Sequence, residues 1–243
     1  MILIPLSGNS PLSNHVSYHV SPLYELAASL HALAQIEPPE PYQVWTNEVI
    51  ERFRMEGLFN DWDYLCPLFR YGIPDLFEAD QTKGVMSVSE LYQYFVTLTT
   101  DAFAQSLKPL IASWNHYHER PPVADDIQND PDFVKGRFNL FMSSYWQLLF
   151  EATWEKIAPL FVTEAERIQQ ACADFPTLQS YLYKLFPSFS FQEERNMLAL
   201  HTSDPDEQVQ SLILQPSYFT CSTSHSKKKT SLYLLYPLSY SSR

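Results

Sequence analysis

Apolar residues recur at the spacing of an α-helix through most of the first 186 residues of the chain. The clearest series begins after Ser21, a favourable N-cap residue that is followed by Pro22 at the first helical position and Glu25 in the first turn. We therefore predict a helix over 22–35, which the proline-rich segment 37–41 ends. Its apolar positions are Leu23, Leu26, Ala27, Leu30, Leu33 and Ala34.

Three further helical series follow. The segment 42–58 predicts an amphipathic helix with Val44, Trp45, Val49, Phe53 and Leu58 on one face. A long helix is predicted from about residue 87, with a kink or break at Pro109, and another from about 138, interrupted by Pro159.

After Pro187 the pattern changes to short β-favouring runs: SFSF, NMLALHT, QSLILQPSYFTC and SLYLLYP, separated by polar segments such as SDPDEQ and STSHSKKKT. They predict a small antiparallel sheet whose closing hairpin lies in 212–237, and the alternating segment 15–20 is a candidate to join it. The predicted class is α+β, with a mainly helical body over about 21–186. We expect a helical domain, 1–186, and a C-terminal sheet, 187–243, packed on it as one structural unit.

Composition narrows the classes of function. Hydrophobic residues make up 45% of the 243 positions, enough for a substantial core. Only 5 residues are glycine, which argues against phosphate-cradling loops and an enzyme built on many tight βα turns. The net charge of −12 disfavours binding to nucleic acid or to anionic membranes by this chain alone. The lysine triplet 227–229 is the exception, and edge protection of a sheet is its commoner role.

The cysteines and the hydropathy of the sequence indicate the cellular compartment. The three cysteines, Cys66, Cys172 and Cys221, are far apart and form no CxxC pair, which favours a reducing, cytoplasmic setting. The N-terminus lacks the basic region of a signal peptide, and no run of about 18 apolar residues follows. No membrane association is expected.

Candidate chemistry is sparse. The HYH segment at 116–118 would place its histidines about 200° apart on a helix, with no third ligand at a known spacing, so no metal site is predicted. No GxSxG motif is present, and Cys66 and Cys172 lie in apolar surroundings typical of core residues. We therefore predict no catalytic residue and no cofactor, and do not expect an enzyme.

Aromatic residues are abundant, at 15% of the chain. Two interpretations remain open for those on the predicted helices: packing in the core, or the lining of a pocket for an apolar small molecule. The candidate pocket residues are Trp45, Trp114, Tyr145, Trp146 and Trp154.

Three blocks carry a resemblance: VSYHVSPLYELAASLHALAQ with VWTNEVIERF soon after, SSYWQLLFEATWEKIAPLF, and LILQPSYFTC with LYLLYP. Their order resembles the long N-terminal region of certain bacterial ArsR-type transcriptional regulators. The resemblance implies a helical domain that ends in a small sheet, followed by a winged helix-turn-helix that binds DNA. The family's helix start matches residues 21–26, its tryptophan before an apolar-proline step matches 154–159, and its PS-F step matches 216–219.

The chain departs from this pattern after Pro237, where only LSYSSR remains and the DNA-binding domain is expected to be absent. It also lacks the cysteine-rich motifs of metal-sensing ArsR repressors. The resemblance thus implies a non-catalytic sensor, partner-binding or dimerisation portion of a regulator, a homodimer or an apolar ligand being its expected partners. The alternative is a stand-alone small-molecule-binding or protein-interaction protein unrelated to transcription.

Overall fold

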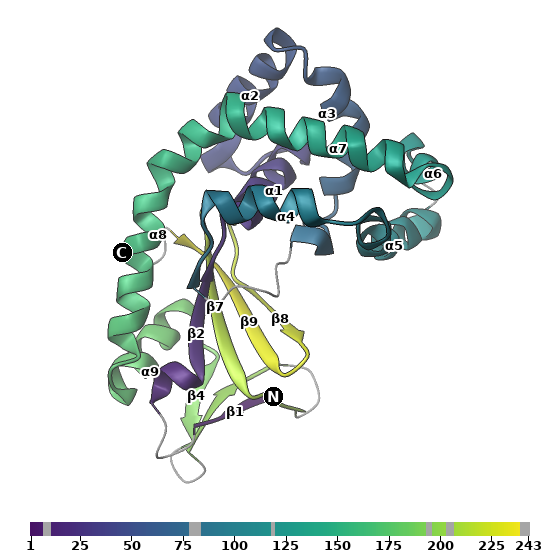
Figure 1. Ribbon diagram of the computed structural model, residues 1–243. Helices are drawn as coiled ribbons and strands as arrows, with labels where there is room; N and C mark the ends of the chain where they lie inside the picture. Colours follow the sequence, from purple (N-terminus) through teal and green to yellow (C-terminus); the bar gives the residue numbers. More distant parts are fainter. Residues whose placement is uncertain (7–10, 78–83, 118–119, 193–195, 203–206, 239–243) are drawn as a thin grey trace. The chain divides into compact units, whose positions relative to one another are not determined.

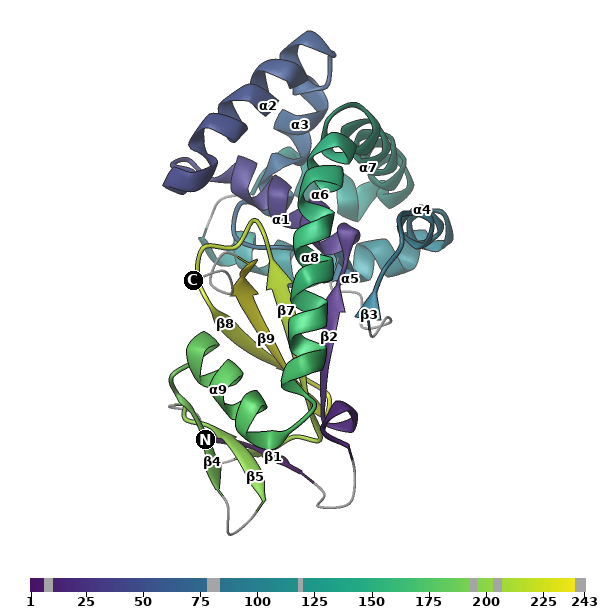
Figure 2. The same cartoon turned by 90° about the vertical axis from the view of Figure 1, so that its left-hand side faces the viewer.

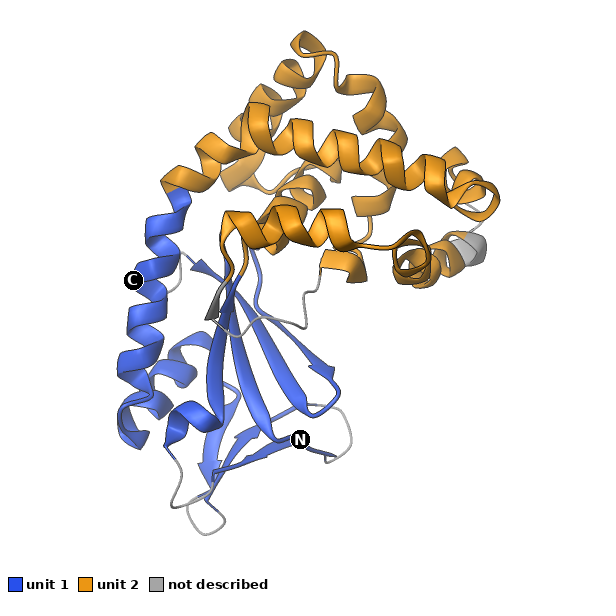
Figure 3. Cartoon of the chain, in the orientation of Figure 1, with its two compact units in different colours: residues 1–20, 82–85, 157–243 blue, residues 21–81, 86–156 orange. Residues whose placement is uncertain are grey.

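The computed structural model describes residues 1–6, 11–77, 84–117, 120–192, 196–202 and 207–238 (Figure 1). Nine α-helices and nine β-strands lie within these ranges, which confirms the α+β class. The chain forms two compact units (Figure 3). Unit 1 consists of residues 1–20, 82–85 and 157–243, and unit 2 of residues 21–81 and 86–156.

Unit 2 is helical. Its helices are α1 (Pro22–Ala34), α2 (Gln43–Met55), α3 (Phe59–Leu65), α4 (Val88–Thr97), α5 (Thr100–Tyr117), α6 (Pro122–Asn129), α7 (Pro131–Tyr145), a π-helical turn (Trp146–Phe150) and the start of α8 (Glu151–Ala171). Helix α1 begins as predicted, because the Ser21 hydroxyl accepts a hydrogen bond from the Tyr24 amide at 3.2 Å. Its apolar positions are buried.

Helix α2 shows where the amphipathic pattern was only partly right. Val49, Phe53 and Leu58 are buried as predicted, but Val44 is 72% exposed. Thr46 takes a buried position instead, and its hydroxyl donates to the Gln43 carbonyl at 2.9 Å. Because this bond satisfies the hydroxyl within the helix, a polar residue is tolerated on the buried face.

The helices are not broken at Pro109 and Pro159: of the kink or break predicted at Pro109, the break is wrong, and so is the interruption predicted at Pro159. The helical segment after residue 87 is interrupted at residues 98–99, where the Thr99 hydroxyl accepts from the Ala102 amide at 3.2 Å and caps α5. Pro109 lies inside α5 and Pro159 inside α8. Each proline removes one backbone donor, but the surrounding helix is long enough to continue past it.

Unit 1 contains two sheets. Its strands are β1 (Ile2–Pro5), β2 (Val16–Val20), β3 (Gly84–Val85), β4 (Phe189–Gln192), β5 (Met197–Leu200), β6 (Glu207–Gln208), β7 (Ser211–Ser217), β8 (Ser224–Lys228) and β9 (Ser231–Pro237). One sheet has the order β4-β5-β1-β6 and the other the order β3-β2-β7-β9-β8. The early strand thus joins the C-terminal strands, as expected, through pairing of β2 with β7.

The expectation of an antiparallel sheet is corrected. Strand β9 runs parallel to β7, and β2 runs parallel to both β7 and β3, whereas β8 and β9 are antiparallel. The closing hairpin is therefore formed by β8 and β9 and turns at Lys229, whose φ is +52°. The sequence hid this arrangement because β8 is a polar, mostly exposed edge strand without an apolar pattern.

The core of unit 1 lies between its sheets and its helices. Helix α9 (Phe175–Leu185) lies beside the strands of unit 1 (Figure 2). Its Leu178, Leu182 and Leu185 belong to the same buried cluster as apolar residues of the strands. Ile2, Ile4 and Ile168 belong to the same cluster. The N-terminal strands and the segment from residue 157 therefore group with the C-terminal strands, and the units do not follow the expected division at residue 186.

Candidate functional site

The five aromatic residues proposed as pocket candidates all lie in unit 2. Trp114, Tyr145 and Trp146 are fully buried, Trp154 is buried and Trp45 is half-buried. The Tyr145 hydroxyl lies 2.8 Å from the Ser29 hydroxyl, and burial raises the pKa of this tyrosine. These positions favour packing for the buried four.

Ring contacts connect much of this core. Phe141 stacks on Tyr145 with centroids 6.1 Å apart, and Phe138 lies 5.2 Å from Phe103. Trp146 contacts Phe150 at 5.5 Å. Helices α2, α3, α4, α5 and α7 all contribute rings, joined through Phe53, Trp62, Phe69, Phe77 and Phe95. The abundance of aromatic residues therefore has a structural explanation in interlocking rings.

A cleft of about 680 Å³ opens elsewhere in unit 2. Its size lies within the range of about 300–1,000 Å³ that small-molecule sites occupy. None of the five aromatic candidates lines it. The lining residues are Leu68, Tyr71, Gly72, Ile73, Pro74, Asp75, Ser106, Pro109, Leu110 and Ser113.

One wall of the cleft is the loop 71–75, which is anchored on both sides. Upstream, His31 Nδ1 of α1 lies 2.6 Å from the Phe69 carbonyl oxygen, and the Gln35 side chain donates to the Arg70 carbonyl at 3.1 Å. Downstream, the Tyr94 hydroxyl donates to the Leu76 carbonyl. Hydrogen bonds from α1 and α4 therefore hold this wall in place.

Gly72 sits within the same loop. Its φ of +154° lies in a region that L side chains rarely adopt, and the space where a Cβ atom would stand is open. The loop requires glycine here for its backbone conformation and not for close packing.

The second wall is helix α5. Ser106, Pro109, Leu110 and Ser113 follow the i, i+3, i+4, i+7 spacing and therefore share one face. The hydroxyls of Ser106 and Ser113 each donate to a carbonyl of the same helix at 2.7 Å, so their oxygens keep acceptor capacity toward the cleft. On the adjacent face of α5, Phe103, Leu107, Ile111 and Trp114 are buried and fix the helix.

The described lining of the cleft carries negative charge and no positive charge. Among the lining residues that the structure describes, Asp75 and Tyr71 carry ionisable side chains, and Asp75 is the acidic one. Unit 2 as a whole contains 20 acidic and 8 basic residues, whereas unit 1 contains 8 of each. The entire net charge of −12 therefore belongs to the unit that carries the cleft.

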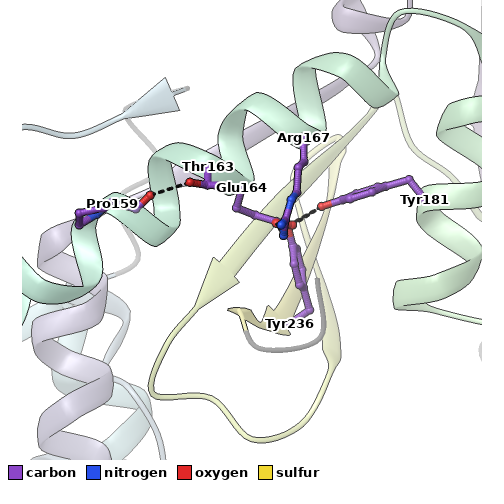
Figure 4. Close-up of polar contacts among 6 residues, drawn as sticks. All are labelled: Pro159, Thr163, Glu164, Arg167, Tyr181 and Tyr236. Atoms are coloured by element: carbon purple, nitrogen blue, oxygen red, sulfur yellow. Dashed lines mark hydrogen bonds and ion pairs between the residues drawn. The ribbon is translucent and has the colours of Figure 1, made fainter. Parts of the chain in front are cut away.

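A second polar constellation lies in unit 1, around a carboxylate that is fully buried (Figure 4). Glu164 of α8 accepts hydrogen bonds on Oε1 from the hydroxyls of Tyr181 and Tyr236, at 2.5 Å and 3.0 Å. Its Oε2 lies 3.4 Å from an Arg167 guanidinium nitrogen. The two tyrosine oxygens are 2.9 Å apart. The cluster joins α8 to α9 and to β9.

Burial and the Glu164 charge both act on these tyrosines. Desolvation is the larger cause that raises the pKa of Tyr181 and Tyr236, and the neighbouring carboxylate raises both further. Each phenol therefore remains a hydrogen-bond donor at neutral pH. The side chains of Glu164, Arg167, Tyr181 and Tyr236 contact one another. We therefore interpret the cluster as structural, with a buried carboxylate stabilised by its neighbours. Nearby, the Thr163 hydroxyl donates to the Pro159 carbonyl at 3.0 Å (Figure 4).

The remaining candidate groups are the cysteines and the possible metal ligands. Burial raises the pKa of the Cys66 thiol, and that of Cys172 to about 11, which disfavours the reactive thiolate. Among the residues that the structure describes, no three His, Cys, Asp or Glu side chains group as a metal site would require. His118 of the HYH segment lies outside the described residues. No described helix has the length and apolar character needed to cross a bilayer.

Comparison of the chain with protein-family models, with curated proteins and with solved structures found no match. The sequence does not reveal the cleft, because the lining residues of its two walls, 68–75 and 106–113, are far apart along the chain and share no motif. The one local signal was the Tyr71–Asp75 segment, where Gly72 and Pro74 interrupt an otherwise apolar and aromatic stretch.

Proposed function

We propose that this chain is the ligand-sensing portion of a cytoplasmic bacterial transcriptional regulator of ArsR type, and that it acts without catalysis. The single observation that carries the sensing role is the cleft of unit 2. It combines a volume suited to a small molecule with a mainly apolar lining and a few polar atoms, as ligand sites do. The link to transcription rests on the resemblance of three sequence blocks.

The anchoring of the cleft supports this role. Its loop is bonded to α1 and α4, and its helical wall is packed into the aromatic core. A site held in this way loses little conformational entropy on binding, which favours affinity. It also connects the ligand to several helices of the unit, as a sensor requires.

The test is occupancy of the cleft by a neutral apolar probe. N-phenyl-1-naphthylamine should bind the full chain and increase its fluorescence. Ser113→Phe should abolish this signal, because the ring fills the cleft from α5. Ala112→Phe is the matched control: it adds the same ring to the preceding residue of the helix, which is exposed and does not line the cleft.

Loss of the signal in Ser113→Phe alone supports the proposal. Equal binding by both variants and the wild type would place the probe elsewhere and overturn it. Both variants should keep the wild-type melting temperature within a few degrees, which shows that the ring has not unfolded unit 2.

The role in transcription has a separate test. The proposal assigns DNA contact to a winged-helix domain of the implied kind, so residues 1–243 should give no sequence-specific shift of duplex DNA at about 150 mM salt. A specific shift by this chain would contradict that division. A natural reading frame that continues past Arg243 into a winged helix would exclude the alternative of a stand-alone binding protein.

A further inference from the structure

The chemistry of the cleft lining discriminates between ligands by charge. Leu68, Ile73, Pro74, Pro109 and Leu110 provide an apolar surface. Asp75 is exposed, so its carboxylate adds a negative charge at the open side. Among the residues that the structure describes, no lysine, arginine or histidine lines the cleft. An anionic ligand would meet repulsion there without compensation.

The basic residues adjacent in sequence do not change this balance. Lys108 precedes Pro109 on α5 but lies two residues from Ser106, which places it about 200° away on the helix and opposite the cleft-facing side. Arg70 directly precedes Tyr71 in the sequence. Both residues are absent from the lining.

The field of the whole unit acts in the same direction. The 20 acidic and 8 basic residues of unit 2 attract cations toward its surface. At physiological salt this attraction decays over about 8 Å, so it favours encounter, whereas Asp75 decides the affinity once the ligand is bound.

An aromatic ring completes the arrangement. Tyr71 lines the cleft and is 52% exposed, so part of its surface is accessible from solvent. A cation over a tyrosine face gains a cation–π attraction in addition to apolar contact. Tyr71 and Asp75 therefore place an aromatic ring and a carboxylate at the two ends of the loop 71–75. These are the two kinds of group that recognise organic cations.

We propose that the cleft selects lipophilic monocations, meaning molecules with an apolar body and one quaternary or protonated centre. The inference rests on the proposed function, since it names the ligand class of the same site. The apolar body occupies the space between Leu68, Ile73 and Leu110. The charged centre lies toward Asp75 and the Tyr71 ring.

The experiment compares two probes of nearly equal size and shape and opposite charge. Tetraphenylphosphonium and tetraphenylborate are titrated into the full chain by isothermal calorimetry. The cation should bind at least about tenfold more tightly than the anion, and the ratio should fall as the ionic strength is raised. Equal affinities, or tighter binding of tetraphenylborate, would overturn the proposal.

Two substitutions locate the charge selection. Asp75→Asn keeps the size of the side chain and should weaken tetraphenylphosphonium binding about fivefold, the effect of one exposed charge pair. Glu48→Gln removes an exposed carboxylate of α2 outside the cleft and should leave the affinity unchanged. Equal losses in both variants would show attraction to the general charge of unit 2 and would contradict selection by Asp75.

The ring has its own pair of variants. Tyr71→Leu should weaken binding of the cation by about fivefold, whereas Tyr71→Phe should retain it, because the ring face is kept. The neutral naphthylamine probe separates the two proposals. If that probe binds and Ser113→Phe abolishes its binding, but the cation has no advantage, the ligand class is wrong and the sensing role stands. If neither the neutral probe nor the cation binds in the cleft, the sensing role itself fails.

Discussion

His19 should make the stability of unit 1 depend strongly on pH. This histidine lies on β2, is 5% exposed, and has no hydrogen-bond partner for its Nε2 atom among the described residues. Desolvation by burial, followed by the positive charge of Lys228, lowers its pKa from 6.5 to about 4. The folded protein therefore holds it neutral at pH values where the unfolded chain would protonate it.

The sign and size follow from this difference. Between pH 6.5 and about 4 the unfolded chain binds more protons at this position than the folded chain, so acidification favours unfolding. At about 1.4 kcal/mol for each pH unit, the whole interval corresponds to about 3 kcal/mol, and the part from pH 6.5 to 5 to about 2 kcal/mol. Well above pH 6.5, where the histidine is neutral in both states, the contribution no longer changes.

The assay must report on unit 1 alone. All five tryptophans lie in unit 2, so native-state hydrogen exchange of the β2 and β7 amides is the appropriate measurement. The free energy of opening is compared at each pH between the wild type and His19→Gln. Titration of carboxylates is common to both proteins and cancels in the difference.

The expected result is a difference that grows by about 2 kcal/mol as the pH falls from 6.5 to 5. His225→Gln, at an exposed position of β8, should follow the wild type. Lys228→Met should reduce the pH dependence, since it removes the charge that helps to lower the pKa of His19. Parallel pH profiles for the wild type and His19→Gln would refute the reasoning.

Two further predictions concern the cores. Tyr236→Phe removes a donor to the buried Glu164 carboxylate and should destabilise unit 1 by about 1–3 kcal/mol in the same exchange assay, whereas Tyr183→Phe, at a 59% exposed position, should have little effect. Phe138→Ala opens the aromatic core and should cost unit 2 about 3–5 kcal/mol in urea unfolding followed by tryptophan fluorescence. Leu140→Ala, on the exposed side of α7, should change it by less than about 0.5 kcal/mol; equal effects of Phe138→Ala and Leu140→Ala would contradict the account.

Local signals in the sequence were sufficient where the physical cause was local. The Ser21 cap and the apolar series after it predicted α1 to within one residue, because both depend on neighbours along the chain. The strand at 15–20 was likewise indicated by its alternation. Pro109 and Pro159 do not break their helices, because the loss of one backbone hydrogen-bond donor does not outweigh the packing of a long helix.

Features set by distant residues could not be predicted. The parallel pairing of β7 and β9 depends on β8, whose polar residues look like a loop in the sequence. Two lysines of β8 make contacts at this edge of the sheet: Lys227 forms an ion pair with Glu207, and Lys228 lies 5.2 Å from the Tyr233 ring centroid. The cleft also depends on residues that are far apart in the sequence. The abundance of aromatic residues does not indicate which rings fill the core and which surface remains open.

The central claim is that a small molecule occupies the cleft of unit 2, and methyl NMR tests it directly. Tetraphenylphosphonium and, in a second titration, N-phenyl-1-naphthylamine are added to the chain labelled at its isoleucine and leucine methyl groups. The account predicts that the methyl signals of Leu68, Ile73 and Leu110 shift with saturation, whereas those of Leu232 and Leu234 in the core of unit 1 stay in place. Unchanged signals at the three cleft residues during both titrations would contradict it.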